Sequence, residues 1–443
     1  MTFFYKEAEF PLHYRRAEVG QIVGALSRLR SVSIHGLAGM GKSNIVRFLV
    51  SHPRVLPHYL PERAQQYVLL HLDCSGLAEC SESEILTEVA IQLQEKGLVP
   101  VLPPLASEPG RARRDLRDRI LRVDPGLHLV VVLDDFDHGA ATLGRAFFNY
   151  LAHLRNARPK GNMLYVFVTR RALGPLHELA ELLDDACVIG PLDWRDTRDS
   201  LRRDGARLGY TFADKEEERL HTLTGGHPGA LKNVAELVAC GAVDLARAED
   251  EVTAQLLRSA KVRRTIEELW QDLTESEQEA VSCVVRGLPL PLQEDDPAAR
   301  LTAYGVLVES TGGPDAPHLR PFCPLLEAFV RARAKGDGPI CLTPVVPNRV
   351  RIKGRLGREE VTLSPLLFEL LLALVQARGE AVSIDELIWR VYGDEAAGAS
   401  NAALSQLVKR LRDAVDPQAQ KVSGDAAYSC VETLRGVGYR LAG

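Results

Sequence analysis

Residues 36–43 read GLAGMGKS and match the pattern G-x-x-x-x-G-K-[ST] in full. In such a phosphate-binding loop, glycines let backbone N–H groups turn inward around phosphate oxygens, and the N-terminus of the following helix adds partial positive charge. Lys42 would supply a point charge to the β- and γ-phosphates, and the Ser43 hydroxyl would ligate Mg²⁺. We therefore predict a nucleotide site here rather than a chance glycine-rich turn. The residues expected around the phosphates are Gly36, Gly39, Met40, Gly41, Lys42, Ser43 and Asn44.

Two further segments carry polar residues where an apolar run ends. LVVVLDDFD (129–137) predicts that Asp134 holds Mg²⁺ and that Asp135 orients or activates the attacking water. VFVTRR (166–171) predicts that Thr169 and Arg170 sense the γ-phosphate. The alternative for both segments is a solvated strand end. We assign the catalytic roles to Asp135, Lys42 and Arg170.

The elements that must position these residues are strands. Five apolar runs are continuous rather than alternating, which is typical of a parallel sheet covered on both faces. Helical patterns of suitable length lie between them, so we expect an α/β nucleotide-binding domain over residues 1–192. The expected strands span residues 31–36, 67–74, 127–135, 163–171 and 186–190.

After residue 192 the sequence pattern changes from alternating strands and helices to mainly helices. Residues 193–262 read as a helical lid, and residues 263–337 as helices followed by a small hairpin, which describes a winged helix. Thr274 and Glu277 form a predicted capping box. Residues 338–348 are rich in Gly and Pro and are the expected linker. Residues 349–443 restart with strands, continue with helices and end in a hairpin.

Composition limits the class of protein. The 443 residues are 46% hydrophobic and 26% charged with a net charge of −5, which is ordinary for a globular protein. The eight cysteines form no zinc-like cluster. The longest apolar runs fall short of the ~20 residues that span a bilayer, and MTFFYKEAEF has acids where a signal peptide has an apolar core. We expect a cytoplasmic protein without a membrane partner.

Over roughly residues 10–335, the motifs resemble the STAND class of signal-transducing ATPases, relatives of AAA+ and NB-ARC proteins. YRRAEVGQ (14–21) is similar to the N-terminal segment of the class, and TGGHPGAL (224–231) resembles its GxP motif. The resemblance places Pro228 near the adenine base. NB-ARC members carry a Met-His-Asp signature that is absent from PHLRPFCPLLEAF (317–329), where His318 or Arg320 could substitute. The resemblance implies a switch that is closed with ADP and opens or oligomerises with ATP.

Residues 349–443 resemble the winged-helix output domain of OmpR/PhoB-type response regulators. NAALSQLVKRLRDAV (401–415) is similar to the recognition helix, and VETLRGVGYRL (431–441) to the terminal wing. Leu404, Val408 and Leu411 share one helical face and should enter the core. The expected DNA contacts are Ser405, Gln406, Lys409, Arg410, Arg412 and, in the wing, Arg435. These 95 residues hold 13 Lys and Arg against 12 Asp and Glu, so a protein-binding role stays open.

The main hypothesis is an ATP-switched transcriptional regulator that uses ATP or ADP with Mg²⁺, hydrolyses ATP slowly, binds duplex DNA and forms homo-oligomers in the ATP state. A second is a defence or stress sensor that recruits an effector or signal protein. A third is an AAA+ replication or transposition ATPase with a trans-acting arginine, for which Arg145, Arg155 and Arg158 are candidates.

Overall fold

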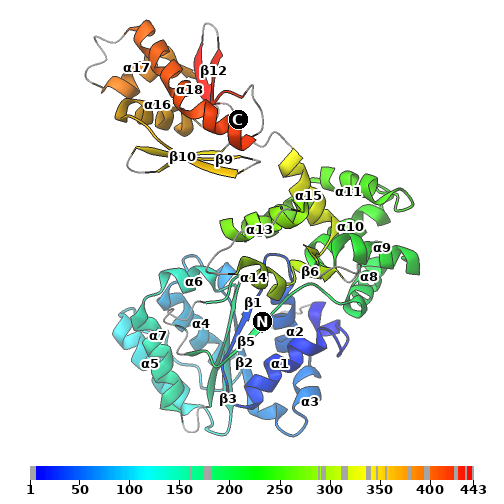
Figure 1. Cartoon of the computed structure of the whole chain (residues 1–443). Coiled ribbons are helices and arrows are strands. Elements are labelled where there is room, and N and C mark those ends of the chain that lie inside the picture. The colour runs from blue at the N-terminus through cyan, green and yellow to red at the C-terminus, as the bar shows by residue number, and fades with distance from the viewer. Residues whose placement is uncertain are drawn as a thin grey trace. The chain divides into compact units, whose positions relative to one another are not determined.

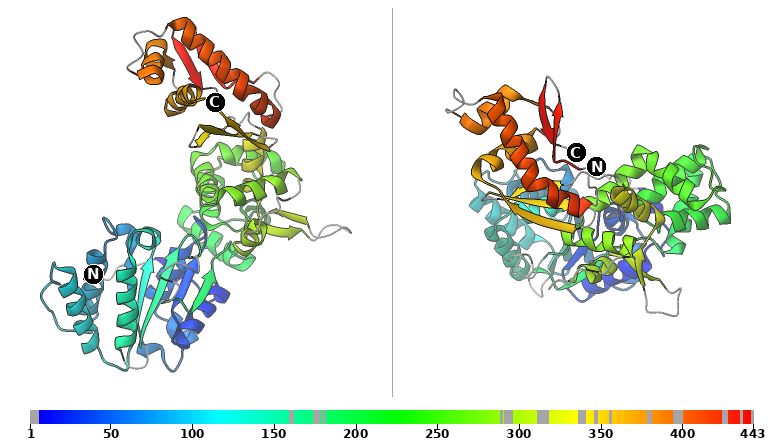
Figure 2. Two further views of the ribbon diagram at one scale, coloured as in Figure 1. Left: turned by 60° about the vertical axis from the view of Figure 1, so that its left-hand side comes forward. Right: turned by 45° about the horizontal axis from the view of Figure 1, so that its top comes forward.

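The chain divides into two compact units, Met1–Phe329 and Val330–Gly443, which we describe separately (Figures 1 and 2). The structure is a computed structural model. It describes residues 6–158, 162–173, 179, 182–287, 290, 296–310, 318–335, 341–345, 348–354, 357–377, 381–393, 400–423, 428–434 and 437–441.

A five-stranded parallel sheet forms the centre of the first unit, in the order β2-β3-β4-β1-β5. Each expected strand is present, and every residue of β3 and β4 is buried, as continuous apolar runs predict. The α/β fold is therefore confirmed. The strands are β1 Val32–His35, β2 Tyr67–Asp73, β3 His128–Asp134, β4 Met163–Thr169 and β5 Asp185–Val188.

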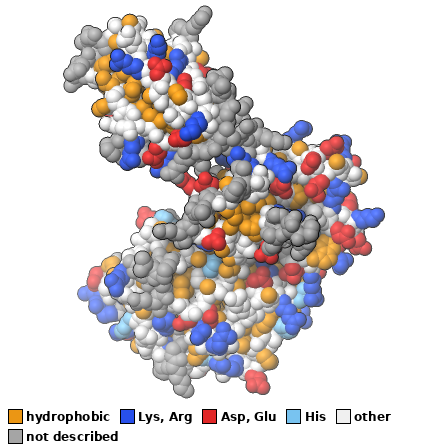
Figure 3. Space-filling model, viewed as in Figure 1, with side chains coloured by type: hydrophobic (Ala, Val, Ile, Leu, Met, Phe, Trp, Pro, Cys, Tyr) orange, Lys and Arg blue, Asp and Glu red, His pale blue; other side chains and the backbone are white. Residues whose placement is uncertain are grey.

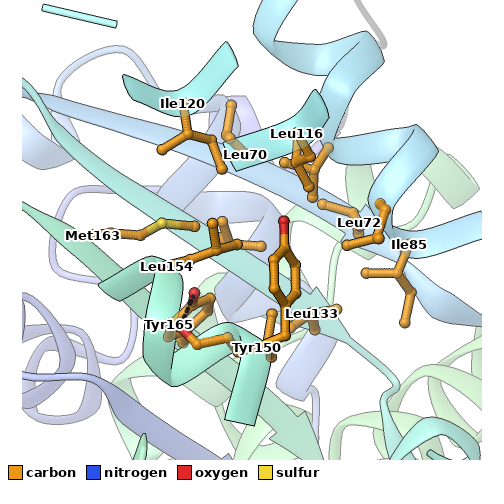
Figure 4. Close-up of a cluster of buried hydrophobic side chains, with 14 of the residues drawn as sticks. Leu70, Leu72, Ile85, Leu116, Ile120, Leu133, Tyr150, Leu154, Met163 and Tyr165 are labelled. Carbon is orange, nitrogen blue, oxygen red and sulfur yellow. Dashed lines mark hydrogen bonds between the residues drawn. The ribbon is translucent and has the colours of Figure 1, made fainter. Parts of the chain in front are cut away.

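Helices cover both faces of this sheet. On one face, Leu70, Leu133 and Tyr165 of the sheet pack with side chains from α4, α5 and α7 in one apolar cluster (Figure 4). On the other face, Ile22 of α1 and Val46 of α2 line a small void with the sheet. The helices around the sheet, on both faces together, are α1 Arg16–Ser27, α2 Lys42–Ser51, α3 Val55–Tyr59, α4 Glu82–Glu95, α5 Pro109–Arg122, α6 Asp137–Thr142 and α7 Arg145–Ala157. Short 3₁₀ turns lie at Lys6–Glu9, Ala64–Gln66 and Cys74–Gly76.

Helices dominate the chain after β5. The predicted capping box is present, because the Thr274 hydroxyl accepts a hydrogen bond from Glu277 N and the Glu277 carboxylate accepts one from Thr274 N. The elements are α8 Trp194–Leu208, α9 Asp214–Thr224, α10 Pro228–Ala239, α11 Glu249–Arg258, α12 Ala260–Gln271, α13 Glu275–Arg286, α14 Pro297–Ala303, β6 Leu307–Ser310, β7 His318–Pro321 and α15 Pro324–Lys335. Strands β6 and β7 pair as an antiparallel hairpin.

The second unit is a winged helix with a sheet at each end of its sequence. Strands β8 Cys341–Val345, β9 Arg349–Gly354 and β10 Gly357–Thr362 form an antiparallel sheet in the order β10-β9-β8. The helices are α16 Pro365–Gln376, α17 Ile384–Tyr392 and α18 Asn401–Ser423. The second sheet has the order β11-β13-β12, from β11 Val382–Ser383, β12 Val431–Leu434 and β13 Gly438–Leu441.

Helix α18 supplies much of the core of this unit. Leu404, Val408 and Leu411 are buried, as their spacing predicts. The helix runs eight residues beyond the expected end at 415 and includes Pro417. A side chain at Gly438 would place its Cβ 2.0 Å from the Val382 carbonyl oxygen, so only glycine fits where β13 pairs with β11. Among the described residues, no helix is both long and apolar enough to cross a membrane.

Candidate functional site

The phosphate-binding loop, residues 36–43, connects β1 to α2. Gly39 and Gly41 have φ angles of +73° and +86°, a backbone conformation that side chains disfavour. A Cβ at Gly39 would also lie 2.4 Å from a ring carbon of His227. Helix α2 begins at Lys42, and no side chain caps its N-terminus. The first amides of α2, including that of Asn44, therefore stay open to an anion.

Lys42 and Met40 turn toward the loop itself. The Lys42 ammonium donates hydrogen bonds to the carbonyl oxygens of Gly36 and Leu37. Burial lowers the pKa of Lys42, while the nearby carboxylates of Asp137 and Asp272 act in the opposite direction. The Met40 side chain is buried, and its N–H donates to the Leu37 carbonyl at 3.3 Å.

Ser43 and Asp134 meet at the carboxyl end of the sheet. The Ser43 hydroxyl donates to Asp134 Oδ1 at 3.1 Å. Asp134 is buried, and its Oδ2 accepts no hydrogen bond within the described part of the chain, although His71 Nε2 lies 3.6 Å away. A hydroxyl beside an unsatisfied carboxylate oxygen fits Mg²⁺, which prefers hard oxygen ligands and takes the remainder from phosphates and water.

Asp135 follows in a strained backbone conformation. Its φ is +54°, which is uncommon for a residue other than glycine and occurs often at functional sites. Burial raises the pKa of Asp135, and the neighbouring carboxylate of Asp137 raises it further. Asp135 is half-buried and lies one residue beyond Asp134, where a base could reach a water molecule.

The end of β4 places Thr169 and Arg170 between β1 and β3. Thr169 is buried, and its hydroxyl donates to the Arg171 carbonyl at 2.8 Å. The Arg170 backbone N–H donates to Asp137 at 2.9 Å. Its guanidinium donates to Asp272 Oδ1 at 3.1 Å, so the sensor predicted for a phosphate is paired with a carboxylate here.

Helix α10 closes over the loop through His227 and Pro228. His227 Nδ1 accepts the Ala230 N–H at 3.1 Å and caps the helix, which leaves Nε2–H to donate to the Ala38 carbonyl at 3.0 Å. Burial lowers the pKa of His227 to about 4, so the ring is neutral. A Cβ at Gly41 would lie 3.5 Å from Pro228 Cγ, which puts this proline beside the loop. Pro228 is among the predicted site residues and His227 is not, although a polar residue directly before a helix-starting proline is a typical cap.

Arg15 holds the phosphate-binding loop in place through hydrogen bonds to backbone carbonyls. Its guanidinium donates to the carbonyls of Met40 at 2.7 Å and Gly190 at 2.9 Å, and it forms an ion pair with Glu18 at 2.9 Å. Its backbone N–H donates to the Asp196 carboxylate at the start of α8. Arg15 is only 1% exposed, so this cation supports the site rather than reaching a ligand.

In the second unit, the expected DNA-contact residues divide into two groups. Ser405, Gln406, Lys409 and Arg410 are exposed on α18. Arg412 instead donates to the Val431 carbonyl and the Thr433 hydroxyl of β12, which gives it a structural role in fixing the wing to the helix. Arg435 lies outside the described residues.

Comparisons with known families cover both ends of the chain. A family profile described as AAA ATPase domain matches residues 11–166, and one described as transcriptional regulatory protein, C terminal, matches residues 358–441. The chain joins an AAA ATPase domain to a transcriptional-regulator C-terminal domain. A search of curated proteins finds no match.

Three solved structures are similar at low identity. A Walker-type ATPase of Pyrococcus abyssi is 15% identical with a TM-score of 0.45, over 72% of this chain and 95% of that one. The ORC2 protein of Aeropyrum pernix, in ADPNP–ADP complexes, is 14% identical with a TM-score of 0.39, over 73% and 95%. The Drosophila ORC bound to DNA is 14% identical with a TM-score of 0.34, over 75% of this chain and 87% of that one.

The other basic residues considered from the sequence, three arginines after β3 and the pair His318 and Arg320, differ in exposure and in their contacts. Arg158 is 3% exposed and donates to four backbone carbonyls between Ile120 and Leu127, so it cannot reach another subunit. Arg155 donates to the Leu182 carbonyl, whereas Arg145 is exposed. Arg320 is exposed on β7, and no contact of the described residues joins it to the loop. The His318 side chain lies outside the described part.

The regulator domain carries charges of both signs. In the space-filling view, Lys and Arg side chains lie among acidic ones on the visible face of this unit (Figure 3). Arg440 pairs with Glu432 at 2.6 Å and Lys421 pairs with Glu359, so part of its positive charge is neutralised internally. Lys409 and Arg410 lie next to each other on an exposed face of α18.

Proposed function

We propose that the chain is an ATP-dependent switch that controls DNA binding by its C-terminal winged helix. The observation that carries the proposal is the Ser43–Asp134 pair beside the phosphate-binding loop, in a chain that also carries a transcriptional-regulator domain. We assign residues 1–192 to nucleotide binding, 193–262 to the lid, 263–337 to a winged helix and 349–443 to DNA binding. The segment expected as the linker, 338–348, contains β8, which pairs with β9 in the sheet of the second unit.

In the proposed site, the loop amides and Lys42 hold the phosphates of ATP or ADP. Ser43 and Asp134 hold Mg²⁺, whose charge offsets that of the phosphates. Asp135 orients the attacking water and accepts its proton, and Arg170 stabilises charge on the transferred phosphoryl group. Pro228 packs against the nucleotide from the lid.

The switch follows from differential binding. A nucleotide biases the conformations of a protein only to the extent that it binds them with different affinity. The lid contacts the loop directly through His227, so loading the loop changes what the lid touches. We propose that ATP opens the ATPase domain and promotes a homo-oligomer, and that several winged helices then bind duplex DNA together.

The test uses the full chain and a fluorescent DNA duplex. We expect ATP to change duplex affinity relative to ADP in the wild type, and Lys42→Ala to abolish nucleotide binding together with this difference. Lys96→Ala, which removes an exposed lysine at the end of α4, is the matched control. A duplex affinity that is the same with ATP and ADP in the wild type, or an ATP–ADP difference that persists in Lys42→Ala, would contradict the switch.

A second candidate has support from the near-neutral regulator domain, which favours a protein partner over DNA. A salt titration separates the two. Phosphate contacts make duplex binding weaken steeply as salt rises. No duplex binding at low salt, with ATP-dependent assembly retained, would favour an effector-recruiting sensor.

A further inference from the structure

Asp272 ends helix α12 and places its carboxylate against the phosphate-binding loop. Its Oδ2 accepts the Ala38 backbone N–H at 2.6 Å, and its Oδ1 accepts a hydrogen bond from the Arg170 guanidinium at 3.1 Å. The side chain is only 9% exposed. Asp272 lies 234 residues from Ala38 along the chain, so this contact depends on the fold of the whole first unit.

The donors that Asp272 occupies are ones that a terminal phosphate would use. Ala38 belongs to the loop, and Arg170 is the proposed sensor of the γ-phosphate. The Asp272 carboxylate also acts on the Lys42 ammonium, where it partly offsets the lowering of the lysine pKa by burial. The Ala38 N–H has a single proton, and Nη1 of Arg170 already points to the carboxylate, so a phosphate that takes these two donors competes with Asp272 for them.

The opposite end of the loop is unaffected by Asp272. No side chain caps the N-terminus of α2 at Lys42, where backbone amides receive the inner phosphates. These amides remain available to the phosphates of ADP while Asp272 stays in place, whereas a phosphate approaching Ala38 and Arg170 would meet the Asp272 carboxylate. Like charges at such short range repel strongly in a partly buried site.

We propose that Asp272 is an internal anion at the position of the third phosphate, so that the closed site selects ADP over ATP until α12 withdraws. This inference rests on the proposed nucleotide function. When α12 withdraws, Arg170 loses its bond to Asp272 and becomes available to the γ-phosphate. We call the closed arrangement, in which Asp272 pairs with Ala38 and Arg170, the Asp272 lock.

The contacts around Asp272 favour two discrete positions of this residue, against the loop or away from it, rather than a continuous range. Arg171 donates to the Asp272 backbone carbonyl at 3.4 Å and pairs at 2.7 Å with Glu277, whose side chain is fully buried at the start of α13. Arg300 of α14 shares the same carboxylate at 3.2 Å. Moving Asp272 therefore shifts a packed, charge-paired junction of three helices, and such junctions change in discrete steps.

The experiment compares ADP with the non-hydrolysable analogue AMP-PNP by calorimetry on the full chain with Mg²⁺. Asp272→Asn keeps the shape and removes the charge. We expect it to bind AMP-PNP about tenfold more tightly than the wild type does, with ADP affinity changed by less than about twofold. Glu268→Gln is the matched control, because Glu268 lies on α12 and pairs with Arg264 away from the loop.

The outcomes separate this inference from the function on which it rests. Unchanged AMP-PNP affinity in Asp272→Asn, or an equal gain for both nucleotides, overturns the role of Asp272. A wild type that binds neither nucleotide overturns the proposed function instead. If Asp272→Asn does not fold, thermal melting of the wild type decides: greater stabilisation by ADP than by equimolar AMP-PNP supports the lock, and the reverse order overturns it.

Discussion

At the scale of single residues, the carboxyl end of the sheet brings together groups with different tasks. Asp134 is buried beside Ser43 with one oxygen unsatisfied, and Asp135 is half-buried in a strained conformation. Two adjacent acids thus have separate environments, which is how one segment can supply both a metal ligand and a base.

Asp134→Asn replaces the anionic oxygen of the proposed Mg²⁺ ligand with an amide. We expect ADP to raise the melting temperature of this variant equally with and without Mg²⁺, whereas Mg²⁺ should increase the shift in the wild type. Asp118→Asn, at an exposed position on α5, is the control. A retained Mg²⁺ effect in Asp134→Asn would remove this residue from the metal site.

Asp135→Asn should fold normally, because asparagine tolerates the positive φ that this position requires. We expect ATP hydrolysis to fall by about two orders of magnitude or more, the usual contribution of a positioned base, with nucleotide affinity kept. Steady-state phosphate release and calorimetry test the two halves. Loss of affinity together with hydrolysis would indicate a binding role instead.

The raised pKa of Asp135 also sets a pH dependence. The base works when ionised, so activity is lost as the pH falls through this pKa, and the loss begins at a higher pH than for an ordinary aspartate. Hydrolysis rates at saturating ATP, measured across the acidic range with melting curves at each pH, test the direction. A profile that follows an unperturbed aspartate would contradict it.

At the scale of elements, the start of α10 performs two tasks through His227. His227→Asn keeps an oxygen that caps the helix but is too short to bond the Ala38 carbonyl, whereas His227→Ala loses both contacts. We expect both variants to bind nucleotide more weakly and to lose stability with the Ala38 bond, and His227→Ala to lose about 1 kcal/mol more, the usual value of a cap. Denaturant unfolding and calorimetry separate the effects; equal stability in both variants would argue against the cap.

Helix α18 offers a similar separation on the regulator domain. Lys409→Ala and Arg410→Ala should each lower the slope of log affinity against log salt by about one, because each removes a phosphate contact. Lys421→Ala is the control, since Lys421 lies on the same helix but pairs with Glu359 of β10. Arg412→Ala should lower the melting temperature through its lost bonds to β12. A slope that stays unchanged in Lys409→Ala and Arg410→Ala would favour a protein partner.

Patterns within short segments predicted the strands, the phosphate-binding loop and the terminal wing, because burial of a strand and a tight glycine turn are written in neighbouring residues. The contacts of Asp272 and His227 with Ala38 could not be predicted in this way. They join residues 234 and 189 positions apart, and only the packing of α10 and α12 onto the loop brings them together. The structural use of Arg412 was equally hidden, since its partner strand follows 19 residues later.

At the scale of the whole molecule, the proposed switch must be reciprocal. If ATP strengthens duplex binding relative to ADP by some factor, linkage requires the duplex to shift the ratio of ATP to ADP affinity by the same factor. Calorimetry of both nucleotides with and without duplex, on the full chain, measures this ratio. A nucleotide effect on DNA without the matching DNA effect on nucleotide would indicate that the two experiments report different assemblies.

One residue of the loop is held from two directions. Ala38 donates its N–H to Asp272 on α12, and its carbonyl accepts from His227 on α10. Its amide proton can exchange with solvent only when the hydrogen bond to Asp272 of α12 breaks, whether or not the contact with α10 is present. Hydrogen exchange at this amide therefore reports how often α12 moves away from the loop, independently of α10. A single backbone amide thus gives a direct measurement of that motion.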